Sequence, residues 1–156
     1  MAKGLKIEAV GLEMFKDVNE VIFGAVEDCM SDIKDDAVKV ASGSAPVDTG
    51  KLEKSYYVRT KKVPLKRCDF SLSFRAMNGN FNYAIWTNDE TYNLGARSRM
   101  KRPAKGRFMK DTPKVGTGYL TNTVELSREG WAKFIQENVA RKMRASIRKN
   151  SKRKSK

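Results

Sequence analysis

The sequence predicts an α+β fold with a long N-terminal helix, a small antiparallel sheet of three to four strands and a long C-terminal helix. Apolar residues recur every three or four positions over about 12–42 and again over about 118–148, whereas they alternate over 70–76. The chain has 156 residues, which is enough for one domain with a core. We therefore expect a single domain over 1–148 and a basic tail over 149–156.

The N-terminal helix is predicted from an apolar stripe that faces a charged stripe. Gly43 supplies a stop at its C-terminal end, and Pro46 follows where no helix continues. The apolar stripe consists of Phe15, Val18, Ile22, Val26, Cys29, Ile33, Ala37 and Val40.

The sheet is predicted from three segments. Residues 54–63 are rich in aromatic and β-branched types, and 70–76 alternate between apolar and polar residues. Asn78-Gly79 is typical of a tight turn, so 81–87 is expected to return as a third strand. The apolar face that should cover the helix consists of Phe70, Leu72, Phe74 and Ala76.

Residues 88–116 have no apolar period and carry eight Lys or Arg, three Gly and two Pro. A segment of this kind is more often functional than a simple connection, so we expect it to become ordered against neighbouring subunits. Trp86, Tyr92 and Phe108 are candidate anchors of a subunit interface. The alternative places Trp86 in the core and the other two in a mobile loop.

The C-terminal helix has Ser127 and Gly130 as points where it could kink or restart. The end of its basic tail is expected to be disordered when alone. The apolar positions of this helix are Leu120, Val124, Trp131, Ile135, Val139, Met143 and Ile147.

Charge is distributed unevenly along the chain. Residues 1–50 carry five basic and ten acidic groups, whereas residues 51–156 carry 27 basic and 8 acidic groups. This asymmetry suggests one surface for a basic partner and one for a polyanion such as DNA, although an ordinary solvated face is the alternative. The candidate polyanion contacts are Arg141, Lys142, Arg144, Arg148, Lys149, Lys152, Arg153, Lys154 and Lys156.

Composition also excludes several classes of function. The chain has no histidine, which removes Ser-His and Cys-His nucleophiles and histidine-containing zinc sites. Cys29 and Cys68 are expected to be buried free thiols, with a disulfide as the alternative. No apolar run approaches the length of a membrane span, and the N-terminus has no secretory signal, so we expect an intracellular chain. We expect no cofactor, no metal and no catalysis.

The stretch SGSAPVDTGKL at 42–52 raises three interpretations. An aspartic protease would need a second Asp-Thr-Gly loop to pair with Asp48, and the chain has one copy after a long helix. A phosphate-binding loop would need Gly at Ala45 and Ser or Thr at Leu52. The third interpretation is a helix-to-sheet connector, in which Asp48 or Thr49 caps a turn and Gly50 tolerates positive φ.

The same stretch resembles the signature of small neck and tail-completion proteins of long-tailed bacteriophages. That family has a long helix, Ala-Pro-x-Asp-Thr-Gly-x-Leu-x-x-Ser, strands, Tyr-Ala, a variable loop and a C-terminal helix opened by an aromatic-Leu pair. The chain departs from the family after Tyr-Ala, where it has Trp86-Thr87-Asn88-Asp89-Glu90. The matching residues are Ala45-Pro46-Val47-Asp48-Thr49-Gly50-Lys51-Leu52, Ser55, Tyr83-Ala84 and Val115-Gly116-Thr117-Gly118-Tyr119-Leu120.

The resemblance implies a structural virion protein of the head–tail junction, made in the host cytoplasm, that forms a ring of six or twelve copies. Its implied neighbours are head-closure or connector, tail-terminator and tail-tube proteins. The alternative from another class is a basic regulatory protein that binds nucleic acid, which the charged C-terminal region favours. Neither function requires a membrane.

Overall fold

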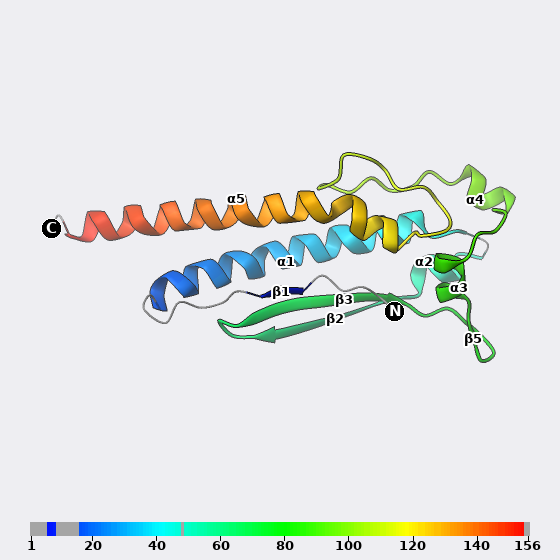
Figure 1. Cartoon of the computed structure of the whole chain (residues 1–156), viewed down its shortest axis with the longest axis horizontal. Helices are drawn as coiled ribbons and strands as arrows, with labels where there is room; N and C mark the ends of the chain where they lie inside the picture. The colour runs from blue at the N-terminus through cyan, green and yellow to red at the C-terminus, as the bar shows by residue number, and fades with distance from the viewer. Residues whose placement is uncertain (1–5, 9–15, 48, 155–156) are drawn as a thin grey trace.

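The computed structural model describes residues 6–8, 16–47 and 49–154. Its elements form three layers, in which helix α1 (Lys16–Ser44) lies between helix α5 (Thr121–Lys154) and an antiparallel sheet (Figure 1). The predicted α+β class, with a long helix at each end of the sequence and a small antiparallel sheet, is confirmed. The described residues contain no helix that is long and apolar enough to cross a membrane.

Helix α1 is buried on two sides because it contacts both other layers. Ile33 and Val40 are fully buried, and so are Ala25 and Ala41, whose small side chains let neighbouring elements approach closely. The predicted helix is confirmed with shifted ends, while Phe15 lies outside the described residues. The core is therefore built around α1.

The main sheet pairs β2 (Tyr56–Val63) with β3 (Arg67–Phe74) along their whole length, from Tyr56 opposite Phe74 to Val63 opposite Arg67. Strand β1 (Lys6–Glu8), which the sequence analysis did not predict, pairs with the other edge of β3. The predicted apolar face is confirmed, since Phe70, Leu72, Phe74 and Ala76 are all buried. Strand β2 begins later than predicted because the short helix α2 (Lys51–Lys54) precedes it.

The predicted third strand at 81–87 is wrong. Strands β4 (Met77–Asn78) and β5 (Phe81–Asn82) form a separate small hairpin, and helix α3 (Tyr83–Asp89) follows at once. The Asn82 side-chain oxygen accepts a hydrogen bond from the Ala84 backbone N–H at 3.3 Å, which caps the start of α3. Asn82 was the sequence signal for this helix, because Asn favours the N-cap position.

The C-terminal helix begins at Thr121, after the predicted position, since Gly116 and Gly118 have positive φ values of 123° and 74°. The Asn88 side-chain oxygen caps it by accepting from the Leu120 backbone N–H at 3.0 Å. The helix runs through Ser127 and Gly130 to Lys154, so the expected disordered tail over 149–154 is helical instead.

Both cysteines are buried free thiols, as predicted. Burial raises the pKa of Cys29, and the neighbouring carboxylates of Asp28 and Asp32 raise it further. Burial likewise raises the pKa of Cys68, with Glu27 adding to the effect. Fewer thiolates form at a given pH when the pKa is raised, so these thiols are poor nucleophiles in the folded chain.

A substitution at Gly130 tests how closely the irregular segment approaches α5. A Cβ atom at Gly130 would lie 1.6 Å from the Phe108 carbonyl oxygen, whereas one at Gly24 in α1 would meet nothing within 4 Å. We expect Gly130→Ala to lower the free energy of unfolding by at least about 2 kcal/mol. We expect the matched control Gly24→Ala to raise it by about 0.5–1 kcal/mol through helix propensity. Urea unfolding followed by circular dichroism measures both, and equal effects of the two substitutions would contradict the close approach.

Candidate functional site

The motif at 45–52 forms a compact connector between α1 and the sheet. Ala45 is fully buried and Leu52 is buried, so the apolar motif residues belong to the core. Gly50 has a φ of 80°, which a residue with a side chain rarely adopts. The Ser55 hydroxyl donates to the Leu52 carbonyl at 2.7 Å and closes the turn of α2. Thr49 is exposed, Pro46 is half-buried, and Asp48 lies outside the described residues.

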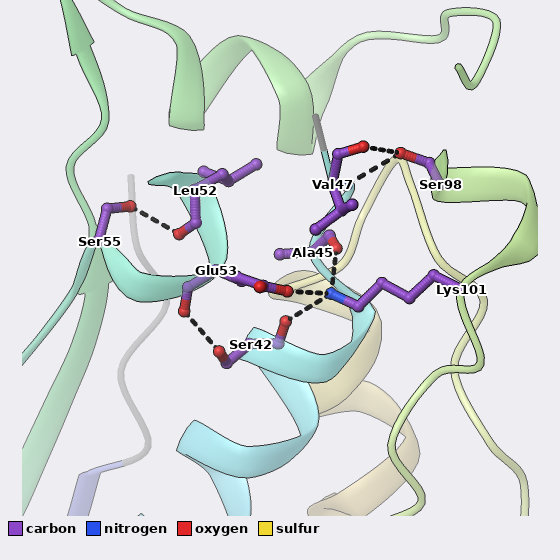
Figure 2. Close-up of polar contacts among 8 residues, drawn as sticks. All are labelled: Ser42, Ala45, Val47, Leu52, Glu53, Ser55, Ser98 and Lys101. Carbon is purple, nitrogen blue, oxygen red and sulfur yellow. Dashed lines mark hydrogen bonds and ion pairs between the residues drawn. The ribbon is translucent and has the colours of Figure 1, made fainter. Parts of the chain in front are cut away.

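Lys101 reaches into this connector from the 88–116 segment (Figure 2). Its ammonium group donates to the Ala45 carbonyl at 2.8 Å and to the Ser42 carbonyl at 3.2 Å, and it pairs with the Glu53 carboxylate at 2.7 Å. The Lys101 side chain is 17% exposed, so these charge-assisted bonds are partly shielded from water. One side chain thus joins the end of α1, helix α2 and the irregular segment.

Ser98 makes a second connection of the same kind. It lies in helix α4 (Ala96–Met100), and its hydroxyl donates to the Val47 carbonyl and accepts from the Val47 N–H, both at 2.9 Å (Figure 2). Ser98 is buried and Val47 is half-buried, so both bonds are partly shielded from water. The connector therefore holds α4 by backbone and side-chain bonds together.

The rest of the 88–116 segment also packs on its own chain. The Arg107 backbone N–H donates to the buried Asp36 carboxylate of α1 at 2.6 Å. The Phe108 and Phe134 rings lie 4.5 Å apart, and the Gly116 N–H donates to the Ser44 carbonyl at 3.1 Å. These contacts correct the expectation that the segment becomes ordered only against neighbouring subunits. Hydrogen bonds hold it together with a few isolated apolar contacts, such as those of Phe108 and buried Met109, so its packing needs no apolar period.

The later motif residues meet at the start of α5. The Tyr119 ring is buried edge-on against Phe74, with ring centroids 5.1 Å apart, and its hydroxyl donates to the Ala84 carbonyl at 3.3 Å. Burial raises the pKa of Tyr119, so the hydroxyl stays protonated as the donor. Tyr83-Ala84 and Gly118-Tyr119-Leu120, separate in sequence, therefore form one packed junction.

No protein-family model, curated protein sequence or solved structure matches this chain. Among the residues that the structure describes, no group of three or more His, Cys, Asp or Glu side chains is arranged to hold a metal ion.

Two of the three candidate interface aromatics lie together. Trp86 stacks on Tyr92 with ring centroids 5.1 Å apart, and Trp86 is 44% exposed. The Tyr92 hydroxyl is buried, and desolvation raises its pKa to about 12. Phe108 is separate from this pair, because it packs on Phe134 within its own chain.

The sequence analysis did not predict an apolar groove that lies beside the junction of Ala84 with Tyr119. It has a volume of about 510 Å³ and lies between the end of β3, helix α3 and the start of α5. Its exposed apolar side chain is Ile85, and its walls come from segments far apart in sequence, which no local pattern brings together. The apolar residues that line it are Phe74, Ala84, Ile85, Tyr119, Leu120 and Val124.

The basic residues of α5 are placed unequally. Arg141, Arg144 and Lys149 are exposed, whereas Lys142 is paired with Asp28 of α1 in the same chain. Arg148 is also exposed. The side chains of Lys152, Arg153 and Lys154 and the whole of Lys156 lie outside the described part. In Figure 1 the last turns of α5 extend past the first turn of α1, so this end projects from the body.

Lys101→Met tests whether the connector orders the irregular segment. Removing the ammonium group leaves Glu53 and two backbone carbonyls without a cationic partner, so we expect the free energy of unfolding to fall by about 1–3 kcal/mol. We also expect faster tryptic cleavage within 96–107. Lys105→Met, at an exposed position in the same segment, is the control. Equal cleavage rates in both variants would refute the role of Lys101.

Proposed function

We propose that this chain is a structural protein of the head–tail junction of a long-tailed bacteriophage, where copies form a ring that joins the DNA-filled head to the tail. The observation that carries the proposal is the order of motifs along the fold. A long helix, the connector from Ala45 to Ser55, antiparallel strands, Tyr83-Ala84, an irregular segment and a long helix follow one another, as in the family that the sequence resembles.

The contacts of the motif residues support a structural role. Ala45 and Leu52 are core residues, Gly50 permits the turn, and Ser55 closes it. The connector in turn holds α4 at the surface through Lys101. Residues that position a surface segment suit a protein that joins neighbours. We propose neither catalysis nor a cofactor for this role.

The proposed assembly is a homo-oligomeric ring, six- or twelve-fold, located in the virion neck. Its proposed neighbours are a head-closure or connector protein on one side and a tail-terminator or tail-tube protein on the other. Exposed Trp86, stacked on half-buried Tyr92, offers a contact surface of the residue types that anchor interfaces.

The projecting end of α5 is proposed to face the DNA in the channel. Exposed Arg141, Arg144 and Lys149 supply diffuse phosphate contacts, which weaken with salt and suit DNA that must slide. The same residues favour the second candidate function, a regulatory protein that binds nucleic acid. A monomer that binds DNA tightly and forms no ring would support that candidate.

The ring itself is tested by native mass spectrometry and negative-stain electron microscopy of the purified chain. We expect a closed oligomer, and we expect an antibody against the chain to label the head–tail junction of virions that contain it. A chain that stays monomeric at high concentration, or label confined to another part of the virion, would overturn the proposal.

The DNA contact is tested with a triple variant, Arg141→Gln, Arg144→Gln and Lys149→Gln. Each lost phosphate contact removes about 0.9 from the slope of log affinity against log salt, so we expect the slope to fall by about 2 to 3. The control neutralises three exposed lysines elsewhere, Lys61, Lys66 and Lys110. Equal slopes for both triple variants would show that the end of α5 is not the contact surface.

A further inference from the structure

Met100 is the most exposed large apolar residue of the described surface. It ends helix α4, and the residue is 77% exposed. Arg99 and Arg102 flank it, and both are exposed. We call Arg99, Met100 and Arg102 the knob. A flexible thioether side chain between two cations suits insertion into an apolar pocket with acidic edges.

The knob is held rigidly by its neighbours in sequence. Ser98 is bonded to both backbone groups of Val47, and Lys101 is bonded to the connector. Both bonded side chains point inward, which leaves Met100 outward between them (Figure 2 shows the inward contacts). Because the backbone of the knob is already held in place, binding orders only its exposed side chains, which limits the conformational entropy lost.

The apolar groove has matching chemistry. Ile85 is 57% exposed at its surface, and Leu120 and Val124 form its α5 wall. Of the described residues that line it, two are acidic, Asp89 and Glu125, and one is basic, Arg75. The acidic pair is notable because residues 51–156 carry 27 basic groups and only 8 acidic ones. The groove therefore favours an apolar side chain with cations beside it.

We propose that the groove of one copy receives Met100 of a second copy of this chain, with Arg99 and Arg102 beside Asp89 and Glu125. This contact rests on the self-association that the proposed function requires, and it names the two surfaces that would form the subunit interface. No residue of the knob lines the groove. Each copy thus presents two different complementary surfaces, which is the requirement for a head-to-tail contact that repeats around a ring.

Met100→Glu tests the knob. The substitution places a carboxylate against an apolar groove with acidic edges, so we expect the dissociation constant for self-association to rise at least tenfold, that is by about 1.4 kcal/mol or more. Tyr57→Glu, at a residue that is 58% exposed on β2, is the matched control and should leave association unchanged. Sedimentation equilibrium measures association, and thermal melting confirms that both variants fold.

A charge exchange tests the pairing of the two surfaces. Glu125→Arg and Arg102→Glu should each weaken association, and a chain that carries both should recover most of it. In addition, a Met100→Glu chain mixed with a Glu125→Arg chain retains one intact groove and one intact knob. We expect this mixture to form pairs that cannot extend.

The outcomes separate this inference from the proposed function. If the wild-type chain forms an oligomer that neither Met100→Glu nor Glu125→Arg weakens, the knob-and-groove contact is overturned. The proposed ring then stands, because another surface must hold its copies together. A wild-type chain that is monomeric overturns both. Additive weakening in the double charge variant, with no recovery, overturns the pairing of Arg102 with Glu125.

Discussion

The rest of the structure depends on the two hydrogen bonds and the ion pair that the Lys101 ammonium group makes. An ammonium group removed from water is stable only where its N–H bonds find acceptors, and here the Ser42 and Ala45 carbonyls and the Glu53 carboxylate supply them. These acceptors belong to the last turn of α1, the connector and α2, which are thereby held in one arrangement. The irregular segment carries the lysine, so it becomes part of the folded body.

The same segment also approaches two helices closely. The segment crosses α1 and α5, where Gly106 and Gly130 leave room for direct backbone approach. The Arg107 N–H donates to one oxygen of the buried Asp36 carboxylate, which lowers the cost of burying this group inside α1. The Arg107 guanidinium lies over the Phe134 ring at 5.5 Å and extends the contact to α5. Hydrogen bonds, a cation–π contact and isolated apolar side chains such as Phe108 and Met109 therefore attach this segment to the helices.

The two ends of the molecule differ in chemistry. Helices α3 and α4 lie at one end of the molecule, and the last turns of α5 project at the other (Figure 1). The first end carries the apolar groove, the stacked pair of Trp86 and Tyr92 and the exposed Met100, whereas the second carries basic side chains. Apolar and aromatic surfaces suit protein neighbours, and a diffuse cationic surface suits a polyanion. The proposed joining role uses both ends, and the connector contributes to it because its bonds to Ser98 and Lys101 fix the position of the knob relative to α1.

The sequence by itself determined the two long helices, the β2–β3 pair and the core face of β3, because periodic apolar residues report directly which face of an element is buried. It misassigned most of 81–87, because the Asn78-Gly79 turn predicted a returning strand, whereas the Asn82 side chain accepts a hydrogen bond from the Ala84 N–H and begins a helix. Only the tertiary structure decided that residues 88–116 pack against their own chain and that the groove exists. Lys101 meets Ala45 across 56 residues of sequence, and no local pattern encodes a contact between groups so far apart along the chain.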